Sequence, residues 1–394
     1  MTTALPPNEP DPPPRVRAGL AIAALAAAAF ALSLNTNVLG PLLPFLGDVL
    51  ALGAGGAQWL LAAAAVGSAL GALLVAPLAA RFGRRRTLLG GLAVFVVASA
   101  LHPVADGVPV FGGLRFVSGL AVGVAYASAS ALVAELFPYA RRGAAMGVFT
   151  AGMFLAIPVG MPLATWLAQR GAWSTIFVVQ AVVGALGFVW TVRAVPPGPP
   201  VERAGRALSM LAAPGVAAAL AATMLHVGSF FVTVQLASTW LDATGLVPKA
   251  EQMWVWACLG LLSVVGSAGL GRVADRIGKR NFVLLTSIVL VACFGLAARG
   301  PGVELLTGCA AVLALTAAAR TGPLQALVSS LVPADRFAAV MGLRGFAMQA
   351  GVAVFAFAAV PVEREFAFRG VLILAAACQF LSYAAIRFGV RERR

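Results

Sequence analysis

Charged residues are scarce in this sequence. Asp, Glu, Lys and Arg together make up 11% of its 394 residues, whereas a soluble domain carries roughly 25%. Hydrophobic residues account for 61%, and the mean hydropathy is +0.94. This composition lies far from that of a soluble domain and indicates a membrane protein.

Cysteine and histidine are also few, with four and two residues respectively. The cysteines all fall in apolar stretches of the second half, where a thiol usually behaves as a small core residue. Their spacing fits neither a disulfide framework nor a metal site. The sequence shows no nucleotide-binding loop and no nucleophile arrangement, so we predict neither an enzyme nor a cofactor. The four cysteines are Cys258, Cys293, Cys309 and Cys378.

Acidic residues number only 14 against 28 Lys and Arg, which gives a net charge of +14. All 14 fall in loops, tails or helix ends, so no carboxyl group is expected at mid-depth in the membrane to carry a proton. The basic residues are dispersed over short loops without interleaved aromatic residues, and we therefore expect no nucleic-acid partner. Anionic lipid headgroups are the expected partners of this charge.

Apolar windows of about 20 residues, each long enough to cross the hydrocarbon core as a helix, recur along the whole chain. They predict an all-α membrane protein with twelve transmembrane helices. The predicted spans are Ala18–Leu46, Gln58–Ala80, Thr87–Leu101, Val110–Phe137, Gly143–Ala168, Trp173–Val195, Gly215–Leu241, Met253–Ala274, Asn281–Ala298, Leu305–Leu331, Ala338–Ala359 and Phe366–Phe388. Many are rich in Ala and Gly, which favours close helix packing in a membrane.

The positive residues predict the orientation of these spans. Twenty of the 28 Lys and Arg fall on one side of the membrane, five on the other and three inside spans. The positive-inside tendency places the richer side, with both termini, in the cytoplasm. Residues 1–16 are Pro-rich and polar and carry no cleavage site, so we expect a disordered cytoplasmic tail and not a signal peptide.

Two hairpin sequences repeat at one offset of 195 residues. AARFGRRR around Gly83 aligns with ADRIGKRN around Gly278, and PYARRGAAMG aligns with PADRFAAVMG at the same offset. Agreement of two loops on one register indicates an internal duplication. We predict two pseudo-symmetric six-helix bundles at 17–195 and 208–388, joined by a Pro/Gly-rich cytoplasmic linker at 196–207 and followed by a basic tail at 389–394. This architecture is that of a secondary transporter.

These residues resemble the major facilitator superfamily over essentially the full chain. GRVADRIGKR (Gly271–Arg280) closely matches the G-x-L-A-D-R-x-G-R-R signature of that superfamily, whereas the first-half copy has Ala76 and Ala80 in place of the first Gly and the Asp. Arg115 and Gly119 resemble the Arg-x-x-x-Gly of drug and sugar exporters. VGMPLATWLAQRGAW resembles the G-x-P-L-G of arabinose-efflux-like and chloramphenicol-efflux-like proteins. Ile157-Pro158 departs from the Gly-Pro of the antiporter motif. The resemblance implies a transporter of the drug:proton antiporter branch.

The two charged hairpins are candidates for a conformational latch at the cytoplasmic side. Asp275 either neutralises its basic neighbours or accepts hydrogen bonds from the exposed N–H groups at the start of the fifth helix, near Arg142–Ala144. Because Ala80 stands at the equivalent position of the first half, we expect the latch to be one-sided. The candidate latch residues are Gly83, Arg84, Gly271, Asp275, Arg276, Gly278 and Arg280.

Ionisable side chains inside the spans are candidates for the transport pathway. His226 shares a helix face with Ser229 and Thr233, and its unperturbed pKa near ~6.5 suits proton coupling. By elimination, His226 is the predicted proton-coupling group; the alternative is a neutral histidine hydrogen-bonded between helices. Arg320 lies near the centre of the tenth span, and we expect it to line a cavity.

Further polar side chains extend this set. Arg115 lies near the outer end of the fourth span, with Tyr126 on the same face, and either lines the pathway or extends to the membrane interface. Arg344 lies near the cytoplasmic surface and is predicted to be structural. Asn35 and Asn37 place polar groups at mid-depth in the first span. Gln349 and Gln379 indicate interhelical hydrogen bonds.

The sequence therefore predicts a monomeric, multi-pass inner-membrane transporter that works by alternating access. The favoured function is export of small organic or amphipathic compounds, drug-like or sugar-like, by proton antiport. An uptake carrier or facilitator for a small organic anion remains the alternative, because Arg320 and Arg115 without an acidic residue give a positive potential. A lipid flippase or a membrane sensor that transports nothing is a third class.

Overall fold

Helices dominate the chain in a computed structural model that describes residues 15–39, 42, 46, 56–197, 207–300, 302–333 and 336–391. These residues contain no strand, and twelve of the helical segments are long and apolar enough to cross a membrane. The predicted all-α membrane fold is thereby confirmed. Most of the predicted tail at 1–16 and linker at 196–207 lies outside the described residues.

The helices of the first half are α1 (Arg15–Asn37), α3 (Gly56–Phe82), α4 (Arg84–Leu101), α5 (Gly107–Leu136), α6 (Tyr139–Gln169) and α7 (Thr175–Ala194). Those of the second half are α8 (Val216–Thr244), α9 (Lys249–Gly269), α10 (Gly271–Ile277), α11 (Lys279–Ala297), α12 (Val303–Ser329) and α13 (Phe337–Gly389). Two short 3₁₀ turns, η1 (His102–Val104) and η2 (Ala207–Ala212), complete these elements.

Two predicted spans differ from the observed helices. Helix α1 ends at Asn37, well before the predicted end at Leu46. The eighth span is divided between α9 and the short α10, with Leu270 at the junction. The last two spans are both included in α13, which is interrupted by Ala367 with φ 53° and ψ −167°. This break follows Glu363 and Glu365, in the charged stretch that separated the two predicted spans.

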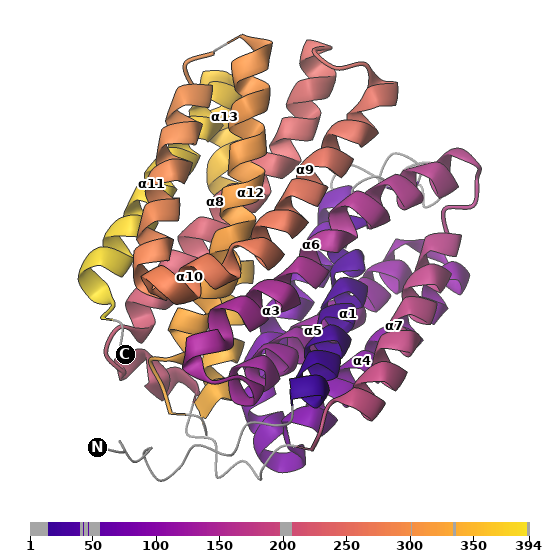
Figure 1. Cartoon of the computed structure of the whole chain (residues 1–394). Helices are drawn as coiled ribbons and strands as arrows, with labels where there is room; N and C mark the ends of the chain where they lie inside the picture. Colours follow the sequence, from indigo (N-terminus) through magenta and orange to yellow (C-terminus); the bar gives the residue numbers. More distant parts are fainter. Residues whose placement is uncertain are drawn as a thin grey trace.

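Each half forms its own bundle. In the first, α3 packs on α5, α4 lies between α5 and α7, and α1 contacts α6 and α7; in the second, α8 packs on α13, and α11 lies against α12 and α13. Figure 1 shows the indigo-to-magenta bundle beside the orange-to-yellow bundle, with the start of α1 and the end of α13 at the same end of the molecule. We call this end the terminal face. The bundles meet where α6 packs on α9, α10 and α12, and where α13 packs on α3 and α5.

Glycine permits very close packing of α3 on α5. A Cβ atom added to Gly119 would overlap the backbone carbonyl oxygen of Ala64 on α3, whereas one added to Gly113 on the same helix would meet nothing within 4 Å. Van der Waals contact between backbones is the main force that associates helices in lipid. This contact therefore sets the position of α5, which carries Arg115 and Tyr126.

Gly119→Val should consequently lower the melting temperature of the purified protein by several degrees, because the added side chain forces α3 and α5 apart. Gly113→Val is the matched control and should leave the melting temperature nearly unchanged. Thermal unfolding of the two variants in the same detergent measures the difference. Equal melting temperatures would show that α5 tolerates displacement from α3.

The backbone confirms the pseudo-symmetry at the offset of 195 residues. Gly83 and Gly278 have the same unusual conformation, with φ and ψ of 82° and 152° in one and 92° and 134° in the other. A positive φ is accessible to glycine without steric cost. Arg85 donates to the carbonyl oxygen of Val192 at 2.6 Å, and Arg280 donates to that of Arg387, also at 2.6 Å. Both arginines thus bind carbonyl groups in the last turn of the final helix of their own half, where carbonyl groups lack intrahelical partners, and Arg280 also donates to the Val390 carbonyl oxygen at 2.7 Å.

Candidate functional site

Asp275 links the two bundles at the terminal face. Its carboxylate accepts hydrogen bonds from the backbone N–H of Gly143 at 3.2 Å and of Ala144 at 2.9 Å, both in the second turn of α6. Lys279 forms an ion pair with the same carboxylate at 2.9 Å, and its ammonium group lies 4.0 Å from the centroid of the Tyr139 ring. The contact combines hydrogen bonds near a helix N-terminus with a charge pair.

The remaining hairpin residues have different surroundings. Gly271 lies so close to Ala144 that an added Cβ would come within 2.9 Å of its Cα. Arg84 is buried and forms an ion pair with Glu135 at 2.5 Å within the first half. Arg276 is exposed. Of the predicted latch residues with described side chains, Asp275 and Gly271 therefore contact the opposite half directly.

A second contact between the halves lies deeper in the seam between α6 and α9. The hydroxyl groups of Thr150 and Ser267 are 2.5 Å apart, and Ser267 also donates to the Gly147 carbonyl oxygen at 2.9 Å. At the symmetry-equivalent seam between α3 and α13, Gly342 packs on Ala72, which has no hydroxyl group. One seam is thus polar and the other apolar, which agrees with the expected one-sided latch.

His226 on α8 belongs to a buried polar network inside the second bundle. Its Nδ1 lies 3.1 Å from Oε1 of Gln379, and that oxygen also accepts from Arg320 at 2.8 Å. Arg320 donates to the Ser382 hydroxyl at 2.7 Å, and the Gln379 amide nitrogen donates to the Ser229 hydroxyl at 2.8 Å. The network connects α8, α12 and α13.

The network fixes the tautomer of a neutral His226. Arg320 has donors only, so the Gln379 atom that faces it must be the amide oxygen. The same oxygen faces Nδ1 of His226, which must therefore carry a hydrogen and donate it. In the neutral ring Nε2 then has the lone pair, and it is the atom that accepts a proton.

Arg320 does not line a cavity in this structure. Its side chain is completely buried, and its guanidinium group points to α13 within the second bundle. This corrects the expectation from the sequence that Arg320 lines a cavity. The sequence indicates the depth of the residue along its span but not the direction in which its side chain points around the axis of α12. Thr233 donates to the Ser229 carbonyl oxygen at 2.7 Å, so its hydroxyl group is used within α8.

Arg115 is buried in the first bundle, with 1% of its surface exposed, and does not extend to the interface. It donates to the side-chain oxygen and to the backbone oxygen of Asn35, both at 2.8 Å. Asn35 lies in the last turn of α1, where the negative end of the helix dipole favours a cation. Asn37 instead donates to the Ser33 carbonyl oxygen at 2.8 Å within the same helix.

The sequence predicted that Tyr126 shares a helix face with Arg115. It predicted Arg344 to be structural and near the cytoplasmic surface. Arg344 is 2% exposed and lies near the start of α13, next to Gly342 and Gly345, which pack on Ala72 of α3. Its predicted depth near the cytoplasmic surface stays a prediction, because burial inside the protein does not determine depth in the membrane.

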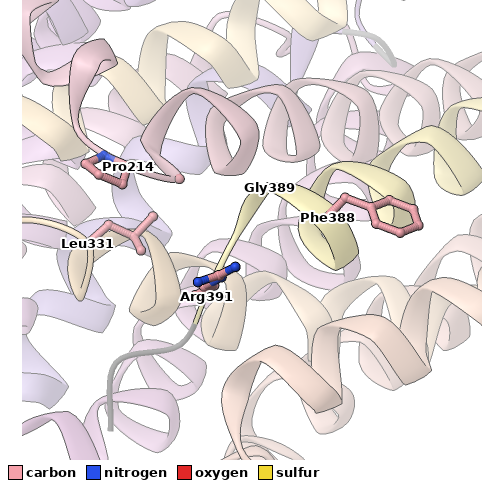
Figure 2. A pocket seen from close by; sticks show the side chains of 6 residues that line it. Pro214, Leu331, Phe388, Gly389 and Arg391 are labelled. Carbon is pink, nitrogen blue, oxygen red and sulfur yellow. The ribbon is translucent and has the colours of Figure 1, made fainter.

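A pocket of about 300 Å³ lies at the terminal face of the second bundle. Figure 2 shows that its labelled residues come from the start of α8 and the ends of α12 and α13. None of the predicted site residues lines it; the lining residues are Pro214, Gly215, Leu331, Phe388, Gly389 and Arg391. Within the described part of the chain, no group of three or more His, Cys, Asp or Glu residues could hold a metal ion.

Two pseudo-symmetric six-helix bundles that carry buried polar networks and meet at one face define a two-bundle membrane transporter. The sequence profile of the Major Facilitator Superfamily matches residues 25–356, and the chain belongs to that superfamily. This confirms the family predicted from the hairpin motifs, and it identifies the protein as a transporter and not an enzyme.

Relatives and solved structures agree with this assignment. The chain is 28% identical over 259 residues to the inner membrane transport protein YdhP of Escherichia coli (strain K12). It is 30% identical over 267 residues to a chloramphenicol resistance protein of Streptomyces lividans. Each match covers 64% of this chain and 66% of the relative.

The fold is similar to that of the proton:xylose symporter XylE bound to 6-bromo-6-deoxy-D-glucose, with a TM-score of 0.79, 17% identity and 96% of both chains covered. It is also similar to that of the human organic anion transporter MFSD10, with a TM-score of 0.75, 18% identity, and 95% of this chain and 100% of that chain covered.

Proposed function

We propose that this protein exports small organic or amphipathic compounds across the inner membrane by alternating access, driven by proton antiport. The surplus of Lys and Arg on the terminal side supports a cytoplasmic terminal face. The similarity to a chloramphenicol resistance protein supports export. In this scheme the structure represents a state in which the bundles are linked on the cytoplasmic side through Asp275.

The proton site is His226, and this is the observation on which the proposal rests. Antiport requires a group that is protonated in one state and unprotonated in another. Among the described residues, every Asp and Glu within a membrane span lies in a terminal turn, and His226 is the imidazole at mid-depth. Its Nδ1 is held as a donor by Gln379, so a single atom, Nε2, gains and loses the proton.

Arg320 acts in this scheme as a positioning residue. Its two hydrogen bonds orient the Gln379 amide and connect the proton site to Ser382 on α13. Since Ser382 in turn donates to the Ala222 carbonyl oxygen on α8 at 2.8 Å, movement of α13 against α8 would disturb the surroundings of His226. Protonation and helix movement are thereby coupled.

His226→Gln should uncouple substrate transport from the proton gradient. A glutamine side chain can still donate to Gln379, so the network and substrate exchange should persist, but it cannot take up a proton. The measurement uses proteoliposomes with a pH-sensitive dye in the lumen and chloramphenicol or ethidium as probes. Wild-type protein should move a probe uphill when a pH gradient is imposed, and the variant should show only downhill exchange.

His102→Gln is the matched control, because His102 is equally buried but lies in an aromatic cluster with Phe111 and Phe177 in the first bundle. It should retain uphill transport. Uphill transport by His226→Gln with an unchanged pH profile would contradict the assignment of the proton site. Wild-type transport that ignores the pH gradient would contradict antiport.

Carriage of a small organic anion is a second candidate function. It is favoured by three buried arginines, Arg115, Arg320 and Arg344, none of which forms an ion pair with a carboxylate among the described residues. The direction of proton movement on substrate addition separates the two, because antiport and symport with a proton change the pH of the lumen in opposite directions.

A further inference from the structure

Arg344 on α13 is the buried cation with the weakest set of hydrogen-bond acceptors. Among the described residues, its Nε and Nη2 atoms have no hydrogen-bond partner. Its Nη1 donates only to the sulfur of Met348 at 3.1 Å. Arg115 and Arg320, by contrast, each form two hydrogen bonds of 2.7–2.8 Å to oxygen atoms. A buried charge without an oxygen partner is costly, so its retention requires another reason.

Tyr126 faces the same region from the other half of the protein. It lies on α5, which packs on α13, the helix that carries Arg344. Its hydroxyl group donates to the sulfur of Met153 on α6 at 3.4 Å, and its ring centroid lies 5.0 Å from that of Phe149. Two donors from opposite halves are thus hydrogen-bonded to thioether sulfurs, which are weak acceptors that an anionic oxygen would readily replace.

The charges around this region all have the same sign. The guanidinium groups of Arg344 and Arg320 both interact electrostatically with His226. Within the described spans every carboxyl group lies in a terminal turn of its span. The potential between α5, α8 and α13 is therefore positive and favours an anion.

The helix geometry directs Arg344 to the interface between the bundles. On α13, Gly342 and Gly345 face Ala72 of α3, and Gly351 faces Met224 of α8. Arg344 and Met348 are one turn apart and lie on the side of α13 that turns from α8, which Gly351 faces, toward α3 of the other bundle, with Arg344 nearer to α8. Helix α13 also packs on α5. A ligand at this point would contact both bundles, as a substrate must if its binding is to change when the bundles move.

We propose that Arg344 and Tyr126 bind the carboxylate of a small organic anion that the protein transports, with the apolar body of the anion against Met153, Met348 and Phe149. This inference deepens the proposed transport function and rests on it for the direction of movement, but not for binding. Arg344 supplies a guanidinium fork of the kind that binds carboxylates in a bidentate manner. The two methionines supply adaptable contact surface, which suits compounds of varied shape.

Equilibrium dialysis of the purified full chain in neutral detergent tests this proposal, with radiolabelled benzoate as the probe and unlabelled benzamide as a neutral competitor of the same shape. Benzoate should bind, and benzamide should not displace it. Arg344→Met should weaken benzoate binding by roughly ten- to a hundredfold, and Tyr126→Phe by about two- to tenfold. Arg344→Lys, which retains the charge, should restore part of the affinity.

Melting temperatures distinguish a binding role from a structural one. Arg344→Met should melt at the same temperature as wild type or higher, because it replaces an unpaired buried charge by an apolar chain of similar length. Arg299→Met is the control for loss of one positive charge, since Arg299 is exposed, and it should bind benzoate like wild type.

Three results would overturn the proposal. The first is absence of benzoate binding to the wild-type protein, and the second is equal binding by the Arg344→Met variant. The third is displacement of labelled benzoate by phosphatidylglycerol at a lower concentration than by unlabelled benzoate, which would assign the site to a lipid headgroup. Dialysis in detergent involves no proton gradient. Failure of proton antiport therefore leaves this result unaffected, and failure of benzoate binding leaves the His226 experiment unaffected.

Discussion

Replacing Asp275 by alanine should open the terminal face and shift the population toward the inward-facing conformation, which is open to the cytoplasm in the proposed scheme. The substitution removes two hydrogen bonds to the second turn of α6 and the ion pair with Lys279. Charge-assisted hydrogen bonds contribute about 1.5–3 kcal/mol each. A total loss of roughly 2–4 kcal/mol would change the ratio of closed to open molecules by about 30-fold or more.

Spin labels on the two halves measure this change. Arg86 and Arg387 are exposed, lie at the terminal face and belong to different bundles, so cysteines at these positions in a background without the native cysteines report the opening as a longer distance. Asp275→Asn should have a smaller effect, because its side-chain oxygen can still accept one hydrogen bond. An unchanged distance distribution in Asp275→Ala would show that the contact does not hold the bundles together.

The pseudo-symmetry supplies a compensating variant. Ala80 is equivalent to Asp275, and the first turn of the second-bundle helix opposite to it begins at Phe337. Ala80→Asp should create an equivalent cap on the apolar seam between α3 and α13. The double variant Asp275→Ala, Ala80→Asp should therefore return the distances toward those of the wild type.

Replacing Gln379 by leucine should destabilise the second bundle more than any other single substitution in the polar networks. The amide accepts from Arg320 and His226 and donates to Ser229, and its side chain is completely buried. Leucine would leave a guanidinium N–H and an imidazole N–H buried without acceptors, at a cost of about 2–4 kcal/mol. The melting temperature should fall by several degrees.

Gln180→Leu is the matched control. Gln180 on α7 is also completely buried, but neither of its amide atoms has a hydrogen-bond partner among the described residues. Its replacement by leucine removes an unsatisfied polar group, so the melting temperature should stay the same or rise. Similar losses in both variants would indicate that packing volume, and not hydrogen bonding, determines stability at these positions.

Local sequence predicted the parts of the site that depend on short segments near a membrane surface. The hairpin around Gly278 is specified by a glycine with positive φ and by basic residues on both sides of it. The position of Asp275 relative to that glycine, compared with Ala80 in the first half, was sufficient to predict a latch carboxylate in one hairpin only. Its acceptor role at the start of α6 was one of two alternatives, and the hydrogen bonds to Gly143 and Ala144 support it.

The surroundings of the buried arginines could not be predicted in the same way. Arg115, Arg320 and Arg344 look alike in the sequence, since each is a cation within an apolar span. Their partners lie on helices distant in the chain, with Asn35 separated from Arg115 by 80 residues and Gln379 from Arg320 by 59. Which partner each one meets depends on the rotation of its helix about its axis, and no local pattern determines that rotation when every face is apolar.

The sequence by itself determined that the chain crosses a membrane twelve times, that it is duplicated, and that it belongs to a superfamily of transporters. Apolar length, charge asymmetry and repeated hairpins are properties of contiguous residues, and the membrane converts them directly into helices and sidedness. Only the tertiary structure decided that Arg115 and Arg320 donate to oxygen atoms within their own bundles, and that Arg344 is buried with a sulfur atom as its acceptor. The reason is that helix rotation and close approach arise from packing at glycines such as Gly119 and Gly342, where backbones of distant segments come into contact.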